Sequence, residues 1–484
     1  MTSPVSKKRI VVFASDHHSG QLNPVLTIAR EFWRLCDQSK TEIHFISNDE
    51  GKGRIEEALP TVRFISTGAS ETQSIGGSVQ APGFYENVFR GKPASVRATV
   101  DIFKLILDRE CYRIILNNTI HYLEKLSQKP VLAIVDAMSL PINDAMRLKK
   151  IDRIVNIPFN AHGCLDVSTL GQWSFPNAGT GYSNQMNLFQ KLHNRFYLLA
   201  VKARLLPTVF NLARLRSSLA GIPYSEISDY VGISNTKHFL IDTIYGFEYS
   251  CDLPVNSSMI GACIDAEGVD AEFDANLKKE PILSWLEKHP RVLFIGLGTI
   301  TKLTKEYVLD LLSAFQRLRV EQPDIQLLFK IPKDCYRPKE GESILENVRV
   351  VNYLHSQLEV LKHKHVRVFV SHCGGNSVHE AIYYGKVVLG LPQWTDCYDF
   401  AQRVEDSGIG LRAKKTIPSV DPSEVYTMLL QLLDNKEFQN KADYFSAKMK
   451  KAGGIKKATD IIFAQLGERP PNNSSSKTVG PIFA

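Results

Sequence analysis

The chain has 484 residues, 44% of them hydrophobic and 23% charged, which is the composition of a globular protein with room for roughly two to three domains. Its mild net charge of +7 fits an anionic small molecule or an acidic membrane as partner, while the lack of a recurring basic, aromatic-rich stripe argues against nucleic acid. The eight cysteines lack metal-like spacing, the N-terminus does not resemble a signal peptide, and no apolar run reaches the ~20 residues of a membrane span, so we expect free thiols and a cytoplasmic protein.

The N-terminal half alternates short apolar runs with longer helical stretches, a pattern typical of a parallel sheet covered by helices. Its first run, residues 10–14, leads through a polar loop to an amphipathic segment at 24–35, where Pro24 suits a first helical turn. Further strands are expected at the remaining apolar runs, residues 43–46, 62–65, 131–135 and 154–157.

Residues 187–219 differ in character, because aromatic and aliphatic residues are interspersed there with lysines and arginines. We favour a helical pair packed on the N-terminal sheet. The same composition also describes a basic amphipathic surface that contacts a membrane peripherally or lines an acceptor channel. The two interpretations are compatible.

A second series of apolar runs follows a polar interval near residues 265–279, with strands expected at 292–295, 326–330, 348–351, 367–370 and 387–390. The pattern predicts an α/β protein with two Rossmann-like doubly wound domains, whose shared cleft would bind the ligands. We assign the domains as follows: an N-terminal domain at 1–255, a linker at 256–285, a C-terminal domain at 286–450, a helix at 451–468 able to pack back on the N-terminal domain, and a disordered tail at 469–484.

The segment 369–396 carries most of the chemistry. An apolar strand ends there in a glycine-rich turn, and a helix follows from residue 376 or 377. Gly374 allows a ligand close to the backbone, and the first N–H groups of the helix form an anion site that can stabilise a departing diphosphate without a metal. Side chains for further hydrogen bonds stand on the same loop and helix: His372, Asn376, Ser377 and Glu380.

These residues resemble the C-terminal signature of the UDP-glycosyltransferase family. The similarity is close over SHCGGNS (371–377) with Glu380, over LPQWTD (391–396) and over DFAQRVEDSGIGLR (399–412), and weaker at 240–248 and 285–299. The resemblance implies the GT-B fold, in which two Rossmann-like domains face each other across a cleft. It also implies a UDP-sugar as co-substrate, with no further cofactor and no metal.

Roles for individual residues follow from the same resemblance. His372, Asn376 and Ser377 would hold the diphosphate together with Gly298 and Thr299 from an earlier turn. Glu380 would bind the ribose. The sugar hydroxyls would be contacted by Trp394 and Asp396.

The family's N-terminal Gly-His-x-x-Pro motif supplies a general base, but here Gln21 stands in the position of that histidine. A neutral amide cannot remove a proton from a hydroxyl. Asp136 matches the family aspartate that orients the base. We therefore expect His18, or less favourably His17, to act as the base, because Asp16 provides a nearby carboxylate. Alternatively, both histidines simply face solvent. In that case Asp136 would act as the base itself, or the acceptor would ionise without help.

Two further departures concern the donor. The family stacks uracil on an aromatic ring ahead of a glutamine that matches Gln357. An ungapped alignment puts Leu354 in the stacking position, whereas a one-residue insertion puts Tyr353 there, and we prefer Tyr353 because a flat ring restores stacking. Cys397 replaces a glutamine that helps to select the sugar, so UDP-glucose is only the default donor.

We therefore expect an inverting hexosyltransferase of secondary metabolism that glycosylates a small lipophilic acceptor such as a phenolic, sterol or other lipid. The acceptor-facing loops would lie at 68–95 and 160–225, the parts least similar to the family. Two alternatives remain: a binding protein of the same fold for UDP-sugar or a lipophile, supported by Gln21, and an epimerase-like enzyme of nucleotide sugars.

Overall fold

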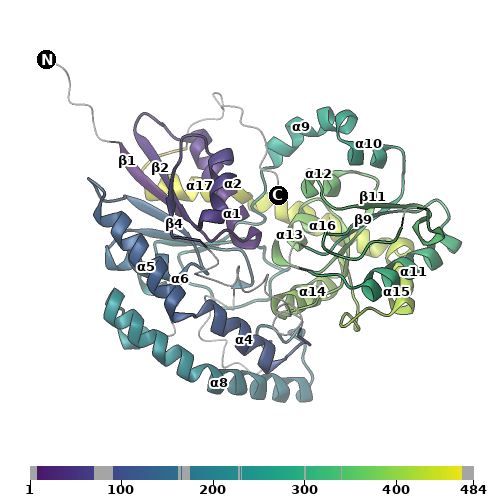
Figure 1. The fold of residues 1–484 in the computed structure, drawn as a ribbon, viewed down its shortest axis with the longest axis horizontal. Coiled ribbons are helices and arrows are strands. Elements are labelled where there is room, and N and C mark those ends of the chain that lie inside the picture. Colours follow the sequence, from purple (N-terminus) through teal and green to yellow (C-terminus); the bar gives the residue numbers. More distant parts are fainter. Residues whose placement is uncertain are drawn as a thin grey trace.

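The computed structural model describes residues 8–69, 91–161, 165, 175–226, 229, 232–298, 301–339 and 341–470. Two lobes lie side by side, each a sheet with helices packed on it (Figure 1). Thr299, most of the acceptor loop expected at 68–95 and residues 471–484 of the expected tail fall outside the described residues.

The N-terminal lobe contains a parallel sheet of seven strands in the order β3-β2-β1-β4-β5-β6-β7. In chain order the strands are β1 (Arg9–Ala14), β2 (Thr41–Ser47), β3 (Arg63–Ser66), β4 (Leu132–Asp136), β5 (Arg153–Ile157), β6 (His238–Ile241) and β7 (Ser257–Met259). The helices are α1 (Ser19–Leu35), α2 (Lys52–Ala58), α4 (Val96–Ile106), α5 (Arg109–Glu124), α6 (Leu140–Leu148) and α8 (Leu188–Ala220).

The C-terminal lobe contains a parallel sheet of six strands in the order β10-β9-β8-β11-β12-β13. In chain order the strands are β8 (Val292–Gly296), β9 (Gln326–Lys330), β10 (Val348–Val351), β11 (Val366–Ser371), β12 (Val387–Gly390) and β13 (Gly410–Arg412). The helices are α9 (Ala266–Lys279), α10 (Pro281–Glu287), α11 (Lys305–Glu321), α12 (Gln357–Lys362), α13 (Gly375–Tyr383), α14 (Thr395–Ser407), α15 (Pro422–Asp434), α16 (Lys436–Ala452) and α17 (Gly454–Gln465).

Both sheets are covered on two faces, which explains why their central strands are apolar throughout rather than alternating. β4 and β8 are buried at every position. In the N-terminal lobe one core forms around α1 and α17, and a second forms on the other face around α5 and α6. The doubly wound α/β class expected from the sequence is therefore confirmed.

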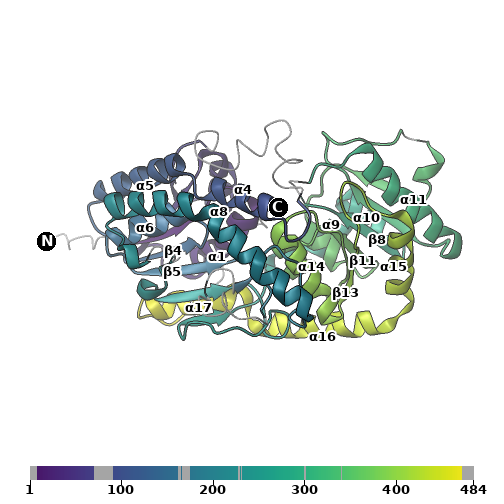
Figure 2. The ribbon, with the colours of Figure 1, turned by 90° about the horizontal axis from the view of Figure 1, so that it is seen from below.

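The C-terminal helix α17 belongs to the N-terminal lobe by contact, although it follows the C-terminal sheet in sequence. It packs against α1, where the rings of Phe32 and Phe463 lie 5.1 Å apart. Figure 2 shows α16 and α17 along one side of the molecule, passing from one lobe to the other. Helix α17 lies within residues 451–468, the segment expected to pack back on the N-terminal domain.

Four sequence expectations need correction. The first long helix begins at Ser19, so Pro24 lies inside α1 and not in a first turn at 24–35. The range 256–285 is not a plain linker, because it holds the edge strand β7 and the helix α9. Residues 187–219 do not form a helical pair, because α8 runs through them as one helix. The C-terminal edge strand β13 was not predicted, since three residues are too few to show a period.

Candidate active site

The strand order reverses between β1 and β4 in one sheet and between β8 and β11 in the other. At such switch points the loops leaving neighbouring strands separate, and a crevice forms beyond the carboxyl ends of the strands. Residues 16–18 follow β1, and residues 372–374 follow β11. The two loops that the sequence singled out therefore stand at the switch points of the two sheets.

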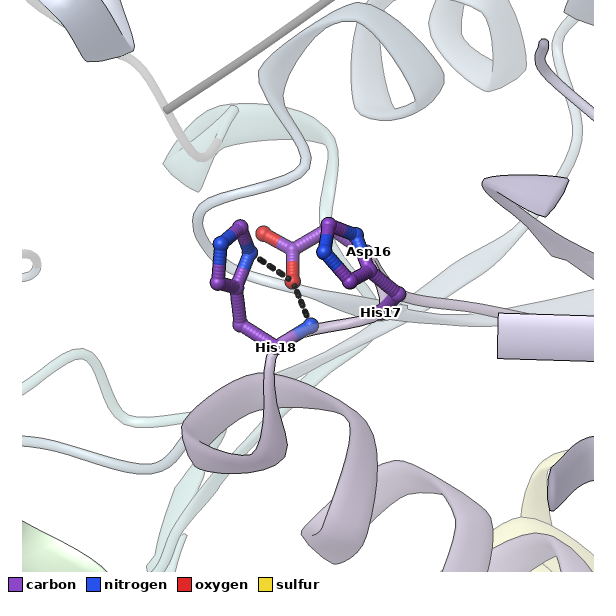
Figure 3. A group of neighbouring side chains, drawn as sticks. All are labelled: Asp16, His17 and His18. Carbon is purple, nitrogen blue, oxygen red and sulfur yellow. Dashed lines mark hydrogen bonds and ion pairs between the residues drawn. The ribbon is translucent and has the colours of Figure 1, made fainter. Parts of the chain in front are cut away.

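Asp16 and His18 form a hydrogen-bonded pair just before α1 (Figure 3). His18 Nδ1 lies 3.1 Å from Asp16 Oδ1, and the His18 backbone N–H donates to the same oxygen at 2.8 Å. Burial alone would lower the pKa of His18, but the charge of Asp16 and this hydrogen bond outweigh burial and raise it above the usual 6.5. Burial likewise opposes ionisation of Asp16, yet His18 holds its pKa below 3.8. The pair thus has the arrangement of an oriented imidazole base.

His17 and Gln21 are less suited to act as the base. Burial and the charge of the neighbouring His18 lower the pKa of His17, and within the described residues its Nδ1 has no hydrogen-bond partner. Gln21 lies in the first turn of α1, where its backbone N–H donates to the His18 carbonyl at 3.0 Å. The turn that carries Gln21 thus supports the residue that we expect to replace the family histidine.

Asp136, expected to orient the base, does not pair with it in the structure. It ends β4 and is fully buried, and its Oδ1 accepts from the Met138 backbone N–H at 2.8 Å. Burial and the nearby charge of Asp16 raise its pKa well above 3.8, and Oδ2 has no hydrogen-bond partner among the described residues. The carboxylate that is hydrogen-bonded to His18 is that of Asp16, so Asp16 holds the position in which Asp136 was expected.

On the C-terminal side, the His372 ring fills the space between two glycines. A Cβ on Gly298 would lie 2.7 Å from His372 Cε1, and one on Gly374 would lie 2.5 Å from His372 Nε2. Burial, followed by the charge of Lys330, lowers the pKa of His372 to about 4, so the ring is neutral near pH 7. A neutral imidazole can donate to a phosphate oxygen without adding a charge.

Helix α13 begins directly after this turn. The Val378 N–H makes the first intrahelical bond, to the Gly374 carbonyl, so the N–H groups of the three preceding residues have no intrahelical acceptor. Asn376 and Ser377 lie in this first turn. N–H groups without intrahelical acceptors, with two polar side chains beside them, are the arrangement that an anion site requires, and the binding of a diphosphate there stays a prediction.

Asn376 also joins the two loops. Its Nδ2 lies 3.4 Å from the Ser19 carbonyl oxygen and 3.2 Å from that of Gly20, both in the first turn of α1. Pro24 explains why the second carbonyl is available, because a proline has no N–H to donate to the residue four positions earlier. The α1 turn beside His18 therefore touches the helix start expected to hold the diphosphate.

Gln357, Glu380 and Lys330 form a second polar group nearby. Gln357 Nε2 donates to Glu380 Oε2 at 2.7 Å. Burial raises the pKa of Glu380 to about 7, against the lowering effects of the Gln357 hydrogen bond and of Lys330. Lys330 ends β9, and the sequence reasoning missed it because a lysine closing an apolar strand has no distinctive pattern.

The two candidates for stacking on uracil differ in exposure. Leu354 is 2% exposed and belongs to the core, while Tyr353 is 59% exposed in the loop between β10 and α12. Only the tyrosine ring is accessible to a base. The geometry therefore favours Tyr353.

The expected sugar contacts gather at the start of α14. The rings of Trp394 and His372 lie 5.3 Å apart, and Asp396 lies in the first turn of the helix, half-buried. Burial raises the pKa of Asp396 above 3.8. Cys397 is fully buried, and burial raises its thiol pKa well above 9, so this side chain does not present a polar group to the cleft.

Comparison with known proteins adds a direct test. The family described as "UDP-glucoronosyl and UDP-glucosyl transferase" matches residues 62–451. The chain belongs to this family. The resemblance drawn from residues 371–412 is thereby confirmed.

Several relatives support the family assignment at different lengths. The chain is 25% identical to glycosyltransferase sdnJ of Sordaria araneosa, over 93% of this chain and 94% of that protein. It is 37% identical to erythritol-mannosyl-transferase 1 of Pseudozyma antarctica (strain T-34), but this match covers only 24% of this chain and 19% of that protein. The matched segment thus spans about a fifth of the length of the mannosyltransferase relatives.

Solved structures confirm the fold. The calicheamicin glycosyltransferase CalG4 superposes with a TM-score of 0.66 at 15% identity, covering 96% of this chain and all of that one. A rice enzyme, Os79 from O. sativa, superposes with a TM-score of 0.59 at 16% identity, over 94% of this chain and 99% of that one. The GT-B arrangement of this family member agrees with the expectation from its sequence.

Contacts between the lobes of this glycosyltransferase-family protein were missed by sequence reasoning. Glu248 and Arg403 form an ion pair of 2.6 Å across the junction, with side chains only 1% and 3% exposed. The carboxylate of Asp399 accepts from the Gly179 and Gly181 N–H groups at 2.7 and 2.9 Å. Residues 399–412 resembled the family, but only the fold shows that they meet the other lobe.

One group in the family member's described residues has the spacing of a metal site. Single ligand atoms of Asp16, His17 and His18 lie within 4.8 Å of one another. The closest pair, however, is already a hydrogen bond between Asp16 and His18. These residues thus fit a proton-transfer pair at least as well as a metal site, and the expectation of a metal-free site stays a prediction.

Proposed function

We propose that this family member is an inverting glycosyltransferase that moves a sugar from a UDP-sugar, UDP-glucose by default, to a hydroxyl of a small lipophilic acceptor. The supporting observation is the contact of Asn376 with the carbonyls of Ser19 and Gly20. This contact puts a half-buried, carboxylate-paired histidine beside a helix start that suits a diphosphate. Phenolics, sterols and other lipids are the acceptor classes that we propose.

The C-terminal lobe would bind the donor. Tyr353 would stack on uracil, and Glu380, kept in place by Gln357, would accept hydrogen bonds from the ribose. The first turn of α13, together with His372, would take the diphosphate. Because these donors are already oriented, they would stabilise the charge that develops as UDP leaves, which needs no metal.

The N-terminal lobe would activate the acceptor. With Nδ1 of His18 bonded to Asp16, Nε2 is the nitrogen left to accept the proton of the acceptor hydroxyl. The acceptor oxygen then attacks the anomeric carbon on the face opposite UDP, the bond from that carbon to the diphosphate oxygen breaks, and UDP departs with the electron pair. A single displacement inverts the anomeric configuration, while Trp394 and Asp396 hold the sugar.

We place this reaction in the cytoplasm, as part of secondary metabolism. The described cysteines are all free, which suits a reducing compartment. UDP-sugar and acceptor are the only small molecules that the reaction requires.

A transfer assay read by mass spectrometry tests the proposal. Purified protein is incubated with several nucleotide sugars, including glucosyl, glucuronosyl and mannosyl donors, and with pooled phenolic, sterol and lipid acceptors. We expect a gain of one hexose unit on an acceptor. Donor interconversion or UDP release without an acceptor would instead indicate an epimerase-like enzyme. UDP binding without any product would support the binding protein that Gln21 first suggested.

A further inference from the structure

Helix α8 has two apolar stripes on opposite faces. The inner stripe is buried and packs against α4, α5 and α6. A second set of apolar side chains lies on the solvent side, at spacings that put them on one face of the helix. We call this set the outer stripe, and it consists of Leu188, Phe189, Leu192, Phe196, Leu199, Leu206 and Phe210.

The outer stripe is strongly exposed. Phe189 is 82% exposed, Phe196 66% and Leu206 65%. Both views of the molecule show α8 on its outside (Figures 1 and 2). A continuous row of exposed aromatic and aliphatic side chains on one helix marks an interaction surface, whereas scattered apolar residues do not.

The charges along α8 are all of one sign. Helical spacing places Lys191, Arg195 and Lys202 along one border of the outer stripe and Arg204 along the other, with Arg214 beyond Phe210. No aspartate or glutamate occurs between Leu188 and Ala220. An apolar ridge on a helix whose charged residues are all cations matches the chemistry of an anionic bilayer surface. It does not suit a second copy of this chain, since two such helices would bring cations against cations.

The helix is anchored to the protein along its inner side. Among the described residues, α8 is the one helix long and apolar enough to cross a membrane, and 28% of its apolar window is buried. Its inner residue Arg216 is bonded to Asp144 at 2.8 Å, with both side chains almost fully buried. Crossing a bilayer would break this pair, whereas lying in the plane of the interface leaves it intact.

We propose that the outer stripe of α8 docks this protein on anionic lipid membranes. The helix lies in the interface, with its phenylalanines and leucines among the acyl chains and its lysines and arginines at the headgroups. From Leu188 to Phe210, at about 1.5 Å per residue, the outer stripe is roughly 33 Å long.

The docking face stands close to the candidate active site. Tyr197, on the inner face of α8, donates to the Ala178 carbonyl at 3.1 Å. The next residue, Gly179, donates to Asp399 of α14, the helix that begins at the expected sugar contacts. If the proposed function holds, an acceptor dissolved in the bilayer is delivered beside the cleft. Docking itself does not depend on that function.

Vesicle flotation tests the proposal without any activity measurement. The full chain is mixed with vesicles of phosphatidylcholine alone or with about 30% phosphatidylserine, conditions that separate apolar insertion from charge attraction. We expect flotation with the anionic vesicles that weakens as salt is raised. Phe189→Ser with Phe196→Ser should lower the partition coefficient at least about tenfold. Val320→Ser, equally exposed at 82% but on α11, should leave it unchanged.

Charge variants complete the test. Lys202→Ala should weaken binding to anionic vesicles about fivefold, while Lys278→Ala on the exposed side of α9 should not. Unchanged flotation of the double serine variant would overturn the proposal. A second result would also overturn it: the wild-type protein binds neither kind of vesicle but sediments as a dimer, and the double serine variant sediments as a monomer. The outer stripe would then serve self-association.

Discussion

At the scale of single residues, the Asp16–His18 pair sets the pH at which the proposed base can work. The pKa of His18 lies above 6.5, so the imidazole loses its ability to accept a proton as the pH falls through that raised value. We expect kcat/KM to fall on the acid side accordingly. Asp16→Asn removes the larger causes that raise the pKa and leaves burial, which lowers it, and the weaker charge of Glu50, so the acid limb should move to lower pH. A profile that does not shift between wild type and Asp16→Asn would rule out this pairing as the tuning contact.

Metal removal probes the same residues. Since the leaving diphosphate is stabilised by α13 and His372 in this account, dialysis against EDTA should leave the transfer rate within about twofold of its starting value. The spacing of residues 16–18 would permit a metal, which makes the test informative. Loss of activity that Zn²⁺ or Mg²⁺ restores would assign those residues to a metal and not to proton transfer.

At the scale of elements, the turn before α13 depends on close contact between His372 and two glycines. Gly374→Ala places a Cβ 2.5 Å from His372 Nε2, and the ring must move. Because Gly374 has a φ of −65°, the change is steric without backbone strain. We expect UDP affinity in calorimetry to drop about tenfold or more.

Gly53→Ala in α2 is the matched control, since a Cβ there meets no heavy atom within 4 Å. It should bind UDP as the wild type does. Equal affinity of Gly374→Ala and wild type would show that the turn does not hold the nucleotide.

The elements also show where sequence reasoning succeeds. All ten expected strands are present, because buried parallel strands are apolar throughout and stand out against amphipathic helices. The start of α1 was missed because Pro24 was interpreted from local preference, while its carbonyl partner four residues earlier bonds to Asn376 from the other lobe. A contact between residues more than 350 positions apart leaves no periodic signal in the chain.

The same limit applies to the candidate site. Asp16, His17 and His18 could be singled out because they are adjacent in sequence. The sequence put Asp16 close to His18, but it could not show that Asp136 makes no hydrogen bond to His18, since that depends on how the end of β4 is buried. Lys330 became apparent only from the sheet, in which β9 lies next to β8 and β8 lies next to β11.

At the scale of the whole molecule, the buried pair Glu248–Arg403 joins the lobes. Arg403→Met leaves the Glu248 carboxylate without its charge partner in a buried position, which should cost about 3–5 kcal/mol of stability. Adding Glu248→Gln should recover most of that loss. The measurement is the midpoint of urea unfolding.

An exposed pair provides the comparison. Arg291 and Asp324 lie 2.8 Å apart, with side chains 33% and 52% exposed, so Arg291→Met should cost at most about 1 kcal/mol. Equal losses for the two arginine variants would contradict a structural role for the junction between the lobes.

The central claim is that His18, paired with Asp16 next to the α1 turn that contacts Asn376, removes the acceptor proton. Its most direct test is the rate of glycosyl transfer by His18→Ala beside wild type and Gln21→Ala, with one acceptor and saturating donor. The account predicts that His18→Ala loses about 10²–10⁴-fold in kcat while still binding UDP, and that Gln21→Ala keeps most of its activity. A His18→Ala enzyme as fast as wild type would contradict the account.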